Sequence, residues 1–253
     1  MKTNSRVHPL LIALVAAAIL PWLMGLAGLT TTSATEVVIF ALACMGLNLL
    51  AGYTGLVSFG HGAWFGLGAY IAALVALALP GDALVIPLLA AVILSTVIAA
   101  GFGWLMLRRR GVYFSLMTLA LSALGFTIAF RWTSVTGGEN GLGGVERPVL
   151  LGIDLNDNMN FYLLVALIAL LAAGLMWRFV NSPLGHVLEA IRENETRATA
   201  LGYDTQRYKL AAFVLSASIT ALAGVLLLYK NRLTSAEPMS IVFSGELLAM
   251  TVI

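Results

Sequence analysis

The chain has 253 residues, of which 60% are apolar and only 10% are charged. A soluble domain carries about 25% charged residues, so the composition excludes a soluble globular domain and indicates an integral membrane protein in contact with lipid. The net charge of +2 gives no reason to expect nucleic acid as a partner.

Several apolar runs are long enough to cross a hydrocarbon core about 30 Å thick as helices of about 20 residues. None shows the period of two that a membrane β-strand requires. The sequence therefore predicts an all-α polytopic membrane protein, a bundle of about seven to eight apolar segments forming a single transmembrane domain over residues 1–253. The expected segments are residues 9–29, 37–51, 63–79, 84–107, 112–130, 161–180 and 208–229, with another beginning near 241.

The first segment follows Lys2 and Arg6 and contains Pro21. A secretory signal is the alternative interpretation of such an N-terminus. Its apolar region is normally about 7 to 15 residues long, which is shorter than the run here. We therefore expect an uncleaved first membrane span.

Residues 37–81 contain no Asp, Glu, Lys or Arg. One straight helix over this region would extend about 68 Å, about twice the thickness of the hydrocarbon core. The chain must therefore reverse direction here, either as a full hairpin or as a re-entrant loop. Either form puts Glu36 and Asp82 on the same side of the membrane.

The stretch GYTGLVSFGHGAWFGLGAY, residues 52–70, lies at this reversal. Glycine weakens a helix by about 1 kcal/mol relative to alanine, so its concentration predicts a break. The first four glycines would permit the turn, and the later ones form a GxxxG spacing through which another helix can approach closely. The glycines expected to act in these ways are Gly52, Gly55, Gly60, Gly62, Gly66 and Gly68.

A break inside a membrane is tolerated only where protein or a water-filled cavity covers it. The broken region is therefore the predicted transport path, since its exposed backbone groups can line a cavity. The polar side chains available near its middle are Asn48, Tyr53, Thr54, Ser58 and His61.

Residues 182–202 predict a short amphipathic helix between two membrane segments. Ser182 suits the N-cap, Pro183 the first helical position and Gly202 a C-terminal cap. The polar face alternates acidic and basic residues, whereas a helix lying on lipid would be rich in lysine. We therefore favour docking of a protein partner, and a helix resting in the membrane interface is the alternative.

The distribution of basic residues predicts a cytoplasmic N-terminus, because cytoplasmic loops carry an excess of Lys and Arg. In that orientation ten basic residues are inside and four are outside. The inner group is Lys2, Arg6, Arg108, Arg109, Arg110, Arg178, Arg192, Arg197, Arg207 and Lys209, and the outer group is Arg131, Arg147, Lys230 and Arg232. The outer segment at residues 133–160 is then either a solvated connector or a contact surface for another protein.

Three blocks of sequence together resemble a known family. They are GLNLLAGYTGLVSFGHGAWFGLGAY at residues 46–70, RRGVYFSLMTLALSALGFTIAFRWTSVTGGENGL at 109–142 and SPLGHVLEAIRENETRATALGYDTQRYKLAAFVLSASITALAGVL at 182–226. They resemble the LivM-type permease subunit of bacterial ABC importers for branched-chain amino acids. The resemblance covers nearly the whole chain from about residue 36, with the blocks in the family's order.

The resemblance implies a multi-pass permease of the bacterial inner membrane that carries branched-chain amino acids or similar small polar molecules. Its implied partners are a second, LivH-like permease, two cytoplasmic ATPase subunits and a periplasmic substrate-binding protein. The segment at 182–202 resembles the helix that couples such permeases to their ATPases. The coupling residues expected on this basis are Ser182, Glu189, Ala190, Ile191, Arg192 and Gly202.

Family members usually continue beyond SGELLAMTVI into further spans. The residues from Ile241 to Ile253 are too few to cross a membrane as a helix. We therefore expect the domain to be incomplete at its C-terminus.

The sequence gives no sign of an enzyme. None of its three lysines, Lys2, Lys209 and Lys230, follows a glycine as a phosphate-binding loop requires, so ATP is expected to bind partner subunits and no cofactor to bind this chain. Ser58 and His61 are weak evidence for a hydrolase in a region without acidic residues. The scattered histidines and the lone Cys44 predict no metal site.

A secondary transporter driven by an ion gradient is the alternative function, because such proteins also use broken helices. They usually bury a charged residue for coupling, and residues 37–81 contain no Asp, Glu, Lys or Arg. A channel or a membrane scaffold is a weaker possibility. The sequence therefore favours the importer subunit.

Overall fold

The computed structural model describes residues 9–79, 84–108, 111–150 and 152–252. Lys2, Arg6, Asp82, Arg109 and Arg110, which entered the expectations above, lie outside these ranges. The long helices are α1 (Pro9–Leu26), α2 (Thr31–Asn48), α3 (Gly62–Ala78), α4 (Val85–Met106), α5 (Val112–Arg131), α7 (Asn158–Val180), α10 (Thr205–Asn231) and α11 (Ile241–Val252). The predicted all-α membrane fold is confirmed, because six of the described helices are long and apolar enough to span a membrane.

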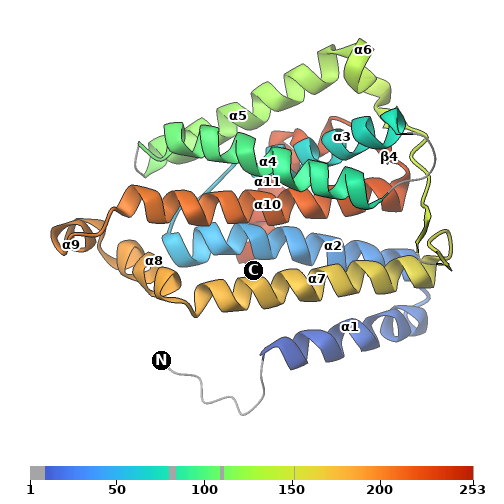
Figure 1. Ribbon diagram of the computed structural model, residues 1–253, viewed down its shortest axis with the longest axis horizontal. Coiled ribbons are helices and arrows are strands. Elements are labelled where there is room, and N and C mark those ends of the chain that lie inside the picture. Colours follow the sequence, from blue (N-terminus) through green and yellow to red (C-terminus); the bar gives the residue numbers. More distant parts are fainter. Residues whose placement is uncertain (1–8, 80–83, 109–110, 151, 253) are drawn as a thin grey trace.

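The helices run roughly along one axis, with α10 inside the bundle beside α2, α3 and α4 (Figure 1). Helix α7 packs on the other side of α2, and α1 packs on α2 and α7 at the edge. One end of the bundle carries the short helices α8 (Pro183–Glu193) and α9 (Glu195–Ala200), and we call it the α8–α9 end. The opposite end carries residues 132–150 and 152–157, and we call it the loop end.

Close contact between α3 and α10 depends on glycine. A Cβ atom built on Gly224 would lie 1.9 Å from the carbonyl oxygen of Phe65, and one on Gly68 would lie 2.3 Å from that of Ala221. Neither position has room for a side chain, since these neighbours are backbone atoms. Small residues allow helices in lipid to gain dispersion contacts along their backbones.

The predicted break lies between α2 and α3. Helix α2 ends in the π-helical turn η1 (Leu49–Tyr53), and helix resumes only at Gly62. Gly55 has a φ of +71°, which favours glycine, and a Cβ on Gly60 would collide with the Thr118 carbonyl oxygen. The reversal is therefore formed by residues 54–61, in which Gly55, Val57 and Phe59 are exposed and the residues between them are buried.

A second interrupted segment faces the first. After α10 the chain forms β4 (Leu233–Thr234) and the 3₁₀ turn η3 (Glu237–Met239), and then enters α11. The Gly62 amide donates a hydrogen bond of 3.1 Å to Ser244 Oγ, and a Cβ on Gly66 would lie 2.4 Å from Met239 Cγ. The GxxxG glycines thus allow the close approach that was expected. Gly62 lies against both the 3₁₀ turn and the helix α11, whereas Gly66 lies against Met239 of the turn.

The loop end is held together by short pairings and by one buried arginine. Its further elements are α6 (Thr133–Thr136), η2 (Gly138–Asn140), β1 (Leu142–Gly143), β2 (Val149–Leu150) and β3 (Ile153–Asp154). Strand β1 pairs antiparallel with β4, and β2 pairs antiparallel with β3. Arg147 donates hydrogen bonds of 2.8 Å to the carbonyl oxygens of Tyr229 and Lys230. These carbonyl groups lie in the last turn of α10, where the helix itself provides no donor for them. Burial, and secondly the charge of Arg232, lower the pKa of Arg147.

Candidate functional site

The segment expected to couple with a partner consists of two helices and not one. Asn194 ends α8 in an extended conformation, and its Oδ1 accepts a 2.9 Å hydrogen bond from the amide of Arg197 in α9. The apolar spacing correctly predicted helix on both sides, but a side chain that caps a new helix interrupts the pattern at Asn194. The expectation of one continuous helix over residues 182–202 was therefore wrong at this position.

The two ends of the segment differ in how well they follow the prediction. Gly202 has a φ of +91°, and the Gly202 and Tyr203 amides bond to the carbonyl oxygens of Thr199 and Ala198, so Gly202 caps α9 as expected. Ser182 occupies the N-cap position of α8 without capping it. Its Oγ donates instead to the Phe179 carbonyl oxygen at 2.5 Å, which ties α8 to the end of α7.

A buried ion pair fixes the segment to α10. Lys209 Nζ lies 2.7 Å from Glu195 Oε1, and Thr205 Oγ1 donates to the same oxygen at 3.0 Å. The Lys209 side chain is only 4% exposed, so its charge depends on this carboxylate. Leu188 and Ile191 are the apolar side chains on the buried face of α8. Movement of the segment is thereby linked to movement of α10.

The segment also touches the break. An Arg192 guanidinium nitrogen donates a hydrogen bond to the Gly52 carbonyl oxygen, and a Cβ atom on Gly55 would lie 3.2 Å from Arg192 Cγ. From the sequence, coupling was expected at Arg192 and a reversal of the chain at Gly52 and Gly55. The structure brings these regions together, although they are far apart along the chain.

The outer face of the segment is available for contact. Glu189 and Ala190 are exposed, whereas Ile191 points inward and is 4% exposed. Apolar side chains also face outward, including Leu184 and Leu201. A face with exposed apolar residues and mixed charges is suited to a protein surface.

Three of the polar residues expected on the transport path lie inside the bundle. Thr54 donates to the Leu50 carbonyl oxygen at 2.5 Å, and Ser58 and His61 are fully buried. His61 Nε2 lies 2.9 Å from Ser216 Oγ, whose hydroxyl donates to the Gly46 carbonyl oxygen at 2.5 Å. Because that hydroxyl proton is committed to Gly46, we infer that Nε2 is the donor to Ser216. The hydrogen bonds of Ser216 thus link His61, directly before α3, and Gly46 of α2 to α10, whereas the Ser58 hydroxyl has no hydrogen-bond partner among the described residues.

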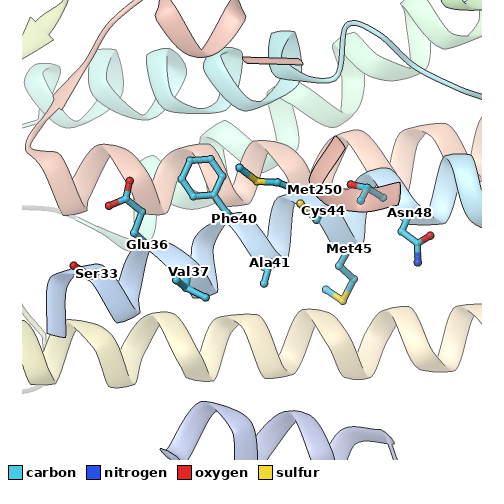
Figure 2. A pocket seen from close by; sticks show the side chains of 10 residues that line it. Ser33, Glu36, Val37, Phe40, Ala41, Cys44, Met45, Asn48 and Met250 are labelled. Carbon is cyan, nitrogen blue, oxygen red and sulfur yellow. The ribbon is translucent and has the colours of Figure 1, made fainter. Parts of the chain in front are cut away.

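Asn48 and Tyr53 are placed differently. Asn48 lines a groove of about 820 Å³ that runs along α2 beside α11, with Ser33 and Glu36 at its loop end (Figure 2). Tyr53 lines a separate cavity of about 220 Å³ near α1 and α7, to which Asn48 also contributes. The structure therefore does not bring the five expected path residues into one cavity.

The pairing of two charges at the loop end of the groove was not predicted from the sequence. Glu36 Oε2 lies 2.6 Å from Lys230 Nζ, which joins α2 to the end of α10. Glu36 lies directly before one apolar run and Lys230 directly after another, and these positions were the only indication in the sequence that the two charges lie at the same end of the bundle. The two residues are too far apart along the chain for any local pattern to predict that they form an ion pair. Across the described residues no group of three His, Cys, Asp or Glu side chains could hold a metal ion.

Comparison with known proteins places the chain among transport permeases. Residues 29–253 match the family described as "Branched-chain amino acid transport system / permease component". The high-affinity branched-chain amino acid transport permease LivM of Escherichia coli is 30% identical over 96% of this chain, and that of Salmonella typhimurium is 31% identical over 87%. LivH of Salmonella typhimurium is 29% identical over 74% of the chain and 66% of its own length.

The chain spans 62% of the length of the Escherichia coli LivM protein and 57% of the Salmonella typhimurium one. No solved structure matches it significantly. The family match covers the broken span, the α8–α9 segment and the buried centre of the bundle. The chain belongs to the branched-chain amino acid transport permease family, a family of membrane transport subunits and not of enzymes.

Proposed function

We propose that this chain acts as a permease subunit of an ATP-driven importer that moves branched-chain amino acids, or similar small polar molecules, across the bacterial inner membrane. The family match over residues 29–253 carries this proposal. It also favours an importer subunit over a transporter driven by an ion gradient. The substrate class follows from the LivM and LivH relatives, which are permeases for branched-chain amino acids.

The proposed assembly contains a second, LivH-like permease, two cytoplasmic ATPase subunits and a periplasmic substrate-binding protein. The similarity to both LivM and LivH supports a pair of related permeases. ATP would bind to the partner subunits, with no cofactor on this chain. The exposed loop end would contact the binding protein.

The proposed orientation puts the α8–α9 end in the cytoplasm. Among the described residues, Arg108, Arg178, Arg192, Arg197, Arg207 and Lys209 lie at or near that end, and Arg131, Arg147, Lys230 and Arg232 lie at the loop end. An excess of basic residues favours the cytoplasmic side. Because α1 begins at the α8–α9 end, the N-terminus would be cytoplasmic as well.

In the proposed mechanism, closure of the ATPases on nucleotide displaces the α8–α9 segment. The Glu195–Lys209 ion pair passes this displacement to α10, and the hydrogen bond from Arg192 to Gly52 passes it to the break. The interrupted segments would then shift relative to each other and change the side to which the path opens. Rigid elements joined at a hinge are a common means of such switching.

For the substrate path, we propose Asn48 as the residue available in this conformation, because it alone of the five expected residues lines the groove along α2. Thr54, Ser58 and His61 would reach the path only if α2, α3 and α10 separate. Replacement of Asn48 by Leu should therefore reduce substrate uptake, because Asn48 already lines the groove in this conformation.

The docking proposal is tested by reversing a charge on the outer face of α8. The complete importer, produced with the products of neighbouring genes, should lose roughly tenfold in ATPase capture and in leucine uptake on Glu189→Lys, because a charge reversal at an interface opposes association. The matched control is Glu139→Lys, which reverses an exposed charge at the loop end. It should leave ATPase capture unchanged.

A normal level of capture and uptake in the Glu189→Lys variant would remove the docking role from this face. Failure of the unaltered chain to capture any ATPase subunit would defeat the importer proposal itself. Gly202→Ala provides a second variant, because the substitution strains the cap of α9 without changing any charge. It should reduce uptake relative to ATP hydrolysis.

A further inference from the structure

An apolar crevice lies between α4 and α5 on the side of the bundle away from the groove along α2. Its volume is about 290 Å³, and α3 forms its floor. Helices α4 and α5 diverge towards the loop end (Figure 1). The crevice belongs neither to the α8–α9 segment nor to the broken span described above.

The rim of the crevice faces the membrane. Leu124 and Ile128 of α5 line it and are 53% and 47% exposed, and Phe102 of α4 lines it from the other side. Exposed apolar side chains on membrane-spanning helices contact acyl chains, which are the solvent at this depth. The crevice is therefore open to lipid along its length.

The floor of the crevice holds a polar atom without a partner. Tyr70 lines the crevice, is 4% exposed, and its hydroxyl forms no hydrogen bond with any described residue. A buried hydroxyl without a partner costs free energy, and the membrane interior contains no water to compensate. A molecule bound in the crevice would stabilise this arrangement if it provided a hydrogen-bond partner for the Tyr70 hydroxyl.

The depth of this hydroxyl matches the polar part of a lipid. Tyr70 packs with Ala129, which lies two residues before the end of α5 at Arg131. Trp132 then lines the loop end of the crevice and is 54% exposed. Tryptophan and arginine at the end of a span mark the region of lipid headgroups. Ester groups of a phospholipid lie just below that level.

We propose that the crevice binds one membrane phospholipid. An acyl chain lies between α4 and α5, the Tyr70 hydroxyl donates a hydrogen bond to an ester carbonyl oxygen, and the phosphate lies near Arg131. Arg131 forms no ion pair with another described residue, so its charge is available to a phosphate oxygen. This site is independent of the proposed transport function.

The test uses a phosphatidylethanolamine with a photoactivatable acyl chain, added to membranes from cells producing the chain with its neighbouring gene products. The unaltered chain should be labelled on residues that line the crevice. Leu124→Trp should reduce this labelling roughly tenfold by filling the crevice. The matched control is Leu116→Trp, because Leu116 lies on the same helix, is equally 53% exposed and does not line the crevice.

Tyr70→Phe removes only the hydroxyl and keeps the shape of the floor. It should reduce labelling roughly two- to tenfold, which corresponds to one net hydrogen bond. Labelling that is equal in the Leu124→Trp and Leu116→Trp variants would overturn the proposal. So would crosslinking of residue 124 to the second permease, since the crevice would then be a protein interface.

Discussion

Helices α1 and α10 are equally apolar yet occupy opposite environments. Both have a mean hydropathy of 2.3, but none of the α1 window is buried, whereas 61% of the α10 window is. Helix α10 carries Ser216, Ser218 and Thr220, and α1 contains no serine or threonine. Hydropathy therefore identifies a membrane span, whereas hydroxyl groups that find partners identify a span inside the protein.

The largest effect is expected at the glycines of these two helices. Gly224→Leu should prevent stable folding, with a cost of about 3 kcal/mol or more, because the Cβ position lies 1.9 Å from the Phe65 carbonyl oxygen. Gly25→Leu in α1 should be tolerated, since nothing lies within 4 Å of its Cβ position. Thermal unfolding of the purified variants in detergent measures both. Equal stability would mean that α10 does not pack against α3 as described.

Truncation of a leucine should give a smaller difference in stability between variants of α10 and variants of α1. Leu226→Ala should destabilise the protein by about 2–4 kcal/mol, because Leu226 is fully buried and the change leaves a cavity. Leu14→Ala should change stability by less than about 0.5 kcal/mol, since Leu14 is 51% exposed and lipid can fill the space. Chemical denaturation in mixed micelles gives the difference. A comparable loss in both variants would place α1 inside the assembled protein.

Removal of single hydroxyl groups should give the smallest difference in stability between two variants. Ser216→Ala should cost about 1–2 kcal/mol, because it leaves His61 Nε2 without its partner in the bundle. Ser95→Ala should be neutral or slightly stabilising, since the buried Ser95 hydroxyl has no hydrogen-bond partner among the described residues. The unfolding midpoints of the two variants test this pair. An unchanged stability of the Ser216→Ala protein would show that the hydrogen bond between Ser216 and His61 does not stabilise the bundle.

The spans themselves could be predicted from the sequence. Residues 84–107 and 112–130 were expected, and the helices are Val85–Met106 and Val112–Arg131. The start of α2 was expected at residue 37 but lies at Thr31. Hydropathy excludes Glu36 because of its charge, and in the structure this half-exposed carboxylate lies within α2 and pairs with the distant Lys230.

The break was expected in the right region, but its neighbours could not be derived. Glycine spacing predicted close packing at Gly62 and Gly66. That the contact is the turn at Pro238 and Met239 depends on how α10 directs the chain back into the bundle. Likewise, the link between Arg192 and Gly52 joins two segments that share no local pattern.

By itself, the sequence determined which segments span the membrane, where the chain must break and which segment has the amphipathic pattern of a docking surface. These properties depend on hydropathy, on glycine content and on helical spacing, all of which are local. Tertiary structure alone decided that Thr54, Ser58 and His61 are buried, that Asn48 lines a groove and that Tyr70 lines an apolar crevice with its hydroxyl buried and unpartnered among the described residues. The reason is that each membrane-spanning helix is apolar on most sides, so the fit of small residues and paired polar groups determines which side faces protein.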